Sequence, residues 1–151
     1  MKILFIVLFA AHLWEEQYWP GGFQGWWNKK LWRTNEDEFP LTRRRNLSHN
    51  TIGLLAAGIA LALLSIVWPP ALFIFVGFIF CDALLHIGLS AEHGYFPGAV
   101  TSIGYVIATI YFLYSFQPKP ELWPIYMVIG VMALLAVYLE SFLKVHKRRK
   151  A

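Results

Sequence analysis

The chain has 151 residues, of which 58% are hydrophobic, 17% are aromatic and only 15% are charged. A soluble domain is about half apolar and about a quarter charged, so this composition indicates an integral membrane protein. The formal net charge is +4, but the 13 lysines and arginines are clustered as in membrane topology signals rather than as in nucleic-acid binding. Cys81 is the single cysteine, which excludes an intrachain disulfide and a cysteine-based zinc cluster.

Five apolar segments follow one another along the chain, which predicts an all-α fold. We expect a polytopic bundle of about five transmembrane helices that forms one domain over residues 1–151. The expected spans are approximately residues 2–19, 51–68, 71–90, 98–116 and 122–143. The first segment also fits a cleaved signal peptide, but Ala10-Ala11 is followed by His-Leu-Trp rather than by a small-x-small cleavage site. This favours a retained first helix.

Residues 20–49, between the first two spans, combine aromatic and basic side chains. These are Trp26, Trp27, Trp32, Lys29, Lys30, Arg33 and the run Arg43-Arg44-Arg45. Aromatic rings anchor in the headgroup region of a bilayer, and cations there meet anionic lipid. We therefore expect an interfacial loop that contacts membrane lipids and no nucleic acid.

The basic residues also predict the orientation of the bundle. If the N-terminus lies outside, eleven of the 13 lysines and arginines fall in the loop at 20–49 and in the tail after residue 143, and only Lys2 and Lys119 remain outside. Cytoplasmic loops carry an excess of Lys and Arg, so this split favours N-out and C-in. In a bacterium the membrane would be the plasma (inner) membrane.

Ionisable residues interrupt the first and third apolar segments. His12, Glu15 and Glu16 are spaced i, i+3 and i+4, so they share one helix face. Asp82 and His86 form an i, i+4 pair on the third segment. Both helices would run inward, which places His12 roughly 15 Å and Asp82 roughly 18 Å below the outer surface. The two clusters are therefore predicted to meet in the cytoplasmic half of the bilayer, as one functional site.

Imidazoles and carboxylates at one depth in a low-dielectric pocket suit a divalent metal. Buried like charges need shared protons or a cation, and histidine nitrogen with carboxylate oxygen binds zinc, iron or manganese. The expected ligands are His12, Glu16, Asp82 and His86, with zinc or iron as the metal. Glu15 and Glu16 are the expected catalytic residues, with Glu15 as a general base or a further ligand.

Three more residues are candidate members of this site: His93, Glu140 and Thr101. Each of the first two also has an ordinary explanation. His93 could be hydrogen-bonded to a neighbouring span, and Glu140 could pair with Lys144 at i+4.

The leading function is a metal-dependent membrane enzyme that acts on a lipid or another hydrophobic small molecule. Two alternatives stay open. A metal-free isomerase or cyclase could use the same carboxylates as general acid and base. A non-catalytic membrane subunit could keep them as a structural polar network. Assembly into a homo-oligomer also stays open.

The spacing His12-x-x-Glu15-Glu16, at the end of the first apolar segment, resembles the motif that names the HXXEE family of integral membrane proteins. The element Asp82-Ala-Leu-Leu-His86 is similar to an Asn-x-x-x-His element of that family, with Asp82 in place of the asparagine. Tyr95-Phe-Pro-Gly98 is similar to its Tyr-x-Pro-Gly stretch. The resemblance implies a small multi-pass membrane protein whose histidine and glutamate residues form a site. It supplies no reaction.

Overall fold

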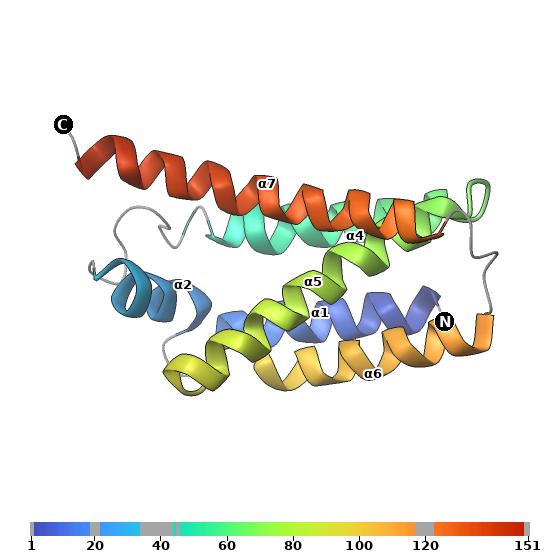
Figure 1. Cartoon of the computed structure of the whole chain (residues 1–151), viewed down its shortest axis with the longest axis horizontal. Coiled ribbons are helices and arrows are strands. Elements are labelled where there is room, and N and C mark those ends of the chain that lie inside the picture. Colours follow the sequence, from blue (N-terminus) through green and yellow to red (C-terminus); the bar gives the residue numbers. More distant parts are fainter. Residues whose placement is uncertain (1, 19–21, 34–43, 45, 117–122, 150–151) are drawn as a thin grey trace.

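The computed structural model describes residues 2–18, 22–33, 44, 46–116 and 123–149. Within these residues the regular elements are all helical, and no strand occurs among them (Figure 1). The all-α prediction is confirmed.

Six α-helices and two π-helical segments follow one another along the described chain. They are α1 (Lys2–Tyr18), α2 (Gly22–Trp26), η1 (Trp27–Trp32), η2 (Asn46–Gly53), α4 (Leu54–Leu64), α5 (Pro70–His93), α6 (Ala99–Phe116) and α7 (Trp123–Arg149). The five expected spans correspond to α1, η2 with α4, α5, α6 and α7.

The helix bounds differ from the expected spans by three or more residues at four ends. The second helical segment begins at Asn46 rather than at residue 51, and it ends at Leu64 because the following residues form turns before Pro69. The third helix continues past residue 90 to His93, and the fifth continues past residue 143 to Arg149. The expected interfacial loop contains the short helices α2 and η1, and its residues 34–43 lie outside the described part of the chain.

Two helical segments are long and apolar enough to cross a membrane, judged by length and composition alone. Asn46–Leu64 has a mean hydropathy of 1.7 and Pro70–His93 has one of 2.3. The apolar stretches Ala99–Ser115 and Trp123–Leu139 are shorter. The five-span topology and its orientation stay predictions.

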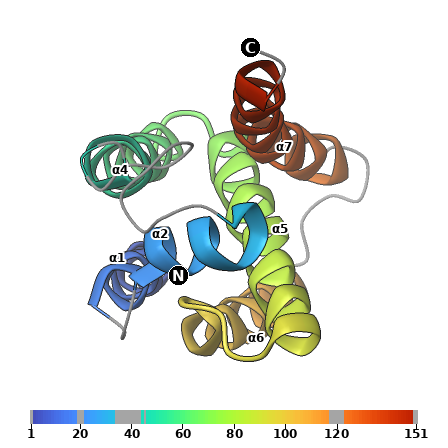
Figure 2. The same ribbon diagram turned by 90° about the vertical axis from the view of Figure 1, so that its left-hand side faces the viewer.

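Helix α5 lies at the centre of the bundle, with α1, α4, α6 and α7 packed around it (Figure 2). Val76, Ile79 and Ala83 of this helix are fully buried. Aromatic rings fill the remaining space, as in the edge-to-face pair of Phe5 and Phe112, whose ring centroids are 5.6 Å apart. A central α5 can therefore bring its polar residues against several helices at once.

The long helices run alternately in opposite directions (Figure 1). The C-terminal ends of α1 and α5 and the N-terminal end of α6 consequently lie at the same end of the bundle. His12 and Glu16 lie near the first of these ends, and His86 lies near the second. This topology places the two polar clusters of the sequence at one level.

Two glycines allow α5 and α7 to approach closely. A Cβ added to Gly77 of α5 would collide with the backbone of Met127, and one added to Gly130 of α7 would collide with the backbone of Ile74 and Phe78. Small residues at a helix crossing let two backbones come together. The contact between α5 and α7 therefore depends on these two positions.

We expect Gly77→Ala to lower the free energy of unfolding by about 1–3 kcal/mol, because the two helices must separate to admit the methyl group. Gly88→Ala is the matched control, since Gly88 also lies within α5 but an added Cβ there meets no atom within 4 Å. That substitution should raise the free energy of unfolding by about 0.5–1 kcal/mol. Thermal unfolding of the purified protein measures both, and a stable Gly77→Ala variant would contradict the close contact.

Candidate metal centre

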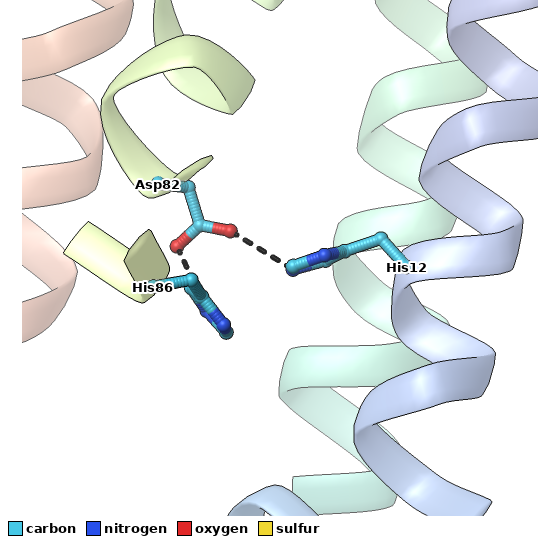
Figure 3. Close-up of side chains that lie close together, drawn as sticks. All are labelled: His12, Asp82 and His86. Carbon is cyan, nitrogen blue, oxygen red and sulfur yellow. Dashed lines mark ion pairs between the residues drawn. The ribbon is translucent and has the colours of Figure 1, made fainter. Parts of the chain in front are cut away.

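The structure brings His12 of α1 against His86 of α5, with the two ring centroids 4.6 Å apart. Both side chains are buried. The carboxylate of Asp82, one turn before His86 on the same helix, points toward both imidazoles (Figure 3). Its Oδ2 lies 3.2 Å from His12 Nε2 and its Oδ1 lies 3.8 Å from His86 Nε2. The two polar clusters therefore meet.

Glu16 supplies a second carboxylate from α1. Its Oε1 lies 3.3 Å from His86 Nε2 and 3.5 Å from His12 Nε2. The side chain is 7% exposed, and that of Asp82 is 13% exposed. Two nitrogens and two carboxylates thus converge on one small volume that is largely closed to solvent.

The opposite nitrogen of His86 decides which tautomer the ring adopts. His86 Nδ1 lies 2.7 Å from the carbonyl oxygen of Pro97. A carbonyl oxygen accepts hydrogen bonds and cannot donate, so Nδ1 carries the hydrogen and donates it. In the neutral ring the lone pair then lies on Nε2, which is the atom that faces Glu16 and Asp82.

The same reasoning applies to His12 through Thr101 of α6. The Thr101 hydroxyl faces two acceptors, Glu15 Oε2 at 2.7 Å and the carbonyl oxygen of Gly98 at 3.1 Å. Its single proton goes to one of them, so it accepts the hydrogen bond from His12 Nδ1 at 2.9 Å. The neutral His12 ring therefore also presents a lone pair on Nε2.

Both Nε2 atoms are buried and lack a hydrogen-bond partner among the residues that the structure describes. Buried polar atoms in native proteins are nearly always satisfied. Lone pairs facing carboxylate oxygens repel them, and the repulsion is relieved either by protons on the nitrogens or by a cation between the four groups. Either protonated imidazoles or a bound cation would give the two Nε2 atoms a partner.

Three of the four groups, those of His12, Asp82 and His86, lie close enough together to hold one metal ion. Neighbouring nitrogen and oxygen atoms are 3.2, 3.3, 3.5 and 3.8 Å apart. In a tetrahedral zinc site with bonds of about 2.0–2.1 Å, two ligand atoms lie about 3.3 Å apart. One ligand atom each of His12, Asp82 and His86 lies within 4.8 Å of the others. All four residues therefore fit zinc or iron in donor type, and His12, Asp82 and His86 also fit in spacing.

Glu15 faces a different partner from its neighbour Glu16. Its Oε2 accepts from the backbone N–H of Thr101 at 2.9 Å, and its Oε1 accepts from the N–H of Val100 at 3.2 Å and from the Tyr95 hydroxyl at 2.6 Å. The N–H groups of a first helical turn have no partner within the helix, and a carboxylate stabilises that positive end. Glu15 therefore caps α6 and attaches it to α1.

The Tyr95 hydroxyl donates to Glu15 from the loop between α5 and α6. Burial, together with the hydrogen bond to the carboxylate, raises the pKa of Tyr95 well above its usual value. The phenol therefore keeps its proton and remains a donor. The catalytic role that the sequence suggests for Glu15 stays a prediction, but these contacts favour a positioning role, exerted on His12 through Thr101.

Gly98 lets this loop pass directly beside the two imidazoles. Its φ is +94°, and an added Cβ would lie 2.6 Å from His12 Cε1 and 2.6 Å from His86 Nδ1. Both the backbone conformation and the space therefore require glycine. The Tyr95–Gly98 loop closes one side of the four-donor site.

The first 113 residues match a known family almost throughout. Residues 3–113 match the family model described as a protein of unknown function with an HXXEE motif. This range includes His12, Glu15 and Glu16 of the motif as well as Asp82 and His86. The chain belongs to the HXXEE family. No curated protein and no solved structure matches this HXXEE protein.

Two tyrosines near the donors were not singled out from the sequence of the HXXEE protein. Tyr138 of α7, beyond the matched range, donates to Asp82 Oδ1 at 3.3 Å. The ring of Tyr105 of α6 lies 5.5 Å from that of His12, and its buried hydroxyl has no hydrogen-bond partner among the described residues. Each lies within a long apolar run, and the sequence carries no signal that distinguishes it from an ordinary packed aromatic residue.

The three additional candidates have different outcomes. Thr101 contacts the site through His12. His93 is the last residue of α5, where its side chain is 35% exposed and its Nε2 lies 3.6 Å from Glu92, so it stands apart from the four donors. Glu140 lies on α7, but its side chain is outside the described part of the structure.

Proposed function

We propose that this HXXEE protein is a metal-dependent integral membrane enzyme that acts on a lipid or another hydrophobic molecule. His12, Glu16, Asp82 and His86 would hold zinc or iron. The observation that carries the proposal is the pair of buried Nε2 atoms, both facing carboxylates and both without a hydrogen-bond partner among the described residues. A metal ion would satisfy all four groups at once.

The proposed setting is a five-span bundle with its N-terminus outside and its C-terminus in the cytoplasm. Two apolar helical segments of sufficient length support a membrane location. The concentration of lysine and arginine after α1 and at the end of α7 supports the orientation. The donors then lie in the cytoplasmic half of the bilayer, where a lipid of the inner leaflet can reach them.

The chemistry proposed is activation of water or polarisation of a carbonyl by the metal. A catalytic zinc site keeps three protein ligands and one exchangeable position, and the metal lowers the pKa of a bound water. Zinc or iron held here would supply a Lewis acid for that chemistry, and Glu16 or Asp82 would accept the proton that a water gives up. Glu16 and Asp82 are thus ligands that can also act as a base.

Elemental analysis of the purified protein tests the proposal, and we expect about one zinc or iron per chain. Turnover of a membrane lipid extract, followed by mass spectrometry, should stop when a chelator removes the metal and resume when the metal is restored. Turnover that persists without metal but stops in Glu16→Gln would instead identify a metal-free acid/base enzyme. Protein without stoichiometric metal and without turnover would indicate a membrane subunit.

Thr101→Val should weaken metal binding about 10–100-fold, because His12 loses the acceptor that holds its tautomer and ring orientation. Ser102→Ala is the matched control, since the adjacent Ser102 hydroxyl donates to the Gly98 carbonyl oxygen at 2.7 Å and not to an imidazole. Competition against a chromophoric chelator measures both affinities. Equal affinities of the two variants would show that Thr101 does not orient the ligand.

A further inference from the structure

A pocket of about 490 Å³ lies along α7 beside the four-donor site. Its lining residues are Met132, Leu135, Ala136, Tyr138 and Leu139. All but one have apolar side chains, and four of the five are spaced i, i+3, i+4 and i+7 on one helix face. Pockets that bind small molecules have volumes of about 300–1,000 Å³ and combine apolar walls with a few polar groups. This pocket has such a volume and such walls, and it is open along α7, the helix that supplies all its lining residues.

Tyr138 connects the pocket to the metal centre. It lines the pocket, and its hydroxyl donates to Asp82 Oδ1 at 3.3 Å. Its ring packs against that of Trp27, with the centroids 5.5 Å apart. A phenol oxygen that donates one hydrogen bond can still accept another. Tyr138 therefore provides the polar side chain among the residues that line the pocket.

We propose that this pocket holds one hydrocarbon chain of a membrane lipid whose polar end carries a hydroxyl group. The chain lies along α7 between Met132 and Leu139, a length of roughly 10 Å. Met132, Leu135 and Leu139 are 59%, 45% and 57% exposed, so the chain enters from the side, out of the bilayer. The hydroxyl donates to Tyr138, next to Asp82. This inference rests on the proposed function and assigns its substrate site.

The probe is a diazirine-bearing long-chain alcohol, photolysed with the full-length protein in lipid vesicles. We expect labelling to concentrate on residues 132–139 and to fall in the presence of excess unlabelled alcohol. Ala136→Trp should lower that labelling roughly tenfold by filling the pocket. Ala133→Trp is the matched control, because Ala133 is an exposed alanine of α7 that does not line the pocket. It should change the labelling less than about twofold.

A second probe examines the hydroxyl contact. A diazirine-bearing alkane without the hydroxyl should label residues 132–139 roughly two- to tenfold less than the alcohol does. Tyr138→Phe, which keeps the ring, should remove this difference. Equal labelling by the two probes in the unmodified protein would overturn the assignment of the polar end.

Labelling spread evenly over residues 132–139 and the exposed face of α6 at Ile107 and Ile110 would show ordinary contact with lipid, and would overturn the pocket. Metal content is measured on the same samples. Protein that contains metal but shows no concentrated labelling would overturn the lipid-binding pocket, and it would leave the proposed metal centre unaffected. Concentrated labelling of protein that contains no metal would contradict the proposed metal-dependent enzyme, and it would still support the pocket as a binding site.

Discussion

Replacing His12 or His86 with alanine should leave the purified protein with almost no bound metal. Each imidazole presents a lone pair from Nε2, in a tautomer held by Thr101 or by the Pro97 carbonyl oxygen. A structural zinc site is worth about 10–16 kcal/mol, so one of four ligands contributes about 2.5–4 kcal/mol. We expect affinity to fall about 100- to 1,000-fold, measured by elemental analysis and by chelator competition.

His93→Ala is the control for this result, because it removes a histidine from the same helix as His86 but lies outside the four donors. Its metal content should equal that of the unmodified protein. If His12→Ala or His86→Ala retained full metal content, the metal would lie elsewhere and the proposed centre would be wrong. If all three variants lost metal equally, the loss would report a general disturbance of the bundle.

Gly98→Ala should disrupt the site as severely as the loss of a ligand. The residue has φ +94°, and a methyl group there would lie 2.6 Å from atoms of both imidazoles. The backbone conformation costs an alanine about 1–2 kcal/mol, and displacing the two rings adds about 1–3 kcal/mol. We expect a lower free energy of unfolding together with a loss of metal affinity, measured by thermal unfolding and by chelator competition.

Gly94→Ala separates the two costs. Gly94 lies at the other end of the same loop with φ +79°, but an added Cβ there meets no atom within 4 Å. It should therefore reproduce the backbone cost without moving the imidazoles, and metal affinity should be unchanged. Equal losses of metal affinity in the two variants would contradict a specific contact between Gly98 and the histidines.

The residues that form the site were largely predictable, because helical periodicity and chain topology are properties of the sequence. His12 and Glu16 at i, i+4 share a face of α1, and Asp82 and His86 share a face of α5. The alternation of apolar segments with short connections then brings these faces to one end of the bundle. The HXXEE family membership was also predictable from the motif residues and is confirmed.

The different roles of Glu15 and Glu16 were not predictable from the sequence. Adjacent helical residues point about 100° apart, and what each side chain contacts depends on which helices pack on its side. Glu16 meets the imidazoles, whereas Glu15 meets the first turn of α6. The contact between Tyr138 and Asp82 was not predictable either, because it depends on the position of α7 along α5 in the packed bundle. The glycine contacts between these helices set that position.

By itself, the sequence determined an all-helical chain of the HXXEE family and the four residues whose spacing puts them on two helix faces. These follow from local periodicity, which needs no neighbour. Only the tertiary structure decided that Thr101 and the Pro97 carbonyl turn both Nε2 atoms toward the carboxylates, and that Glu15 caps a helix. These roles depend on distances between atoms far apart in the chain, and such distances are set by the packing of whole helices.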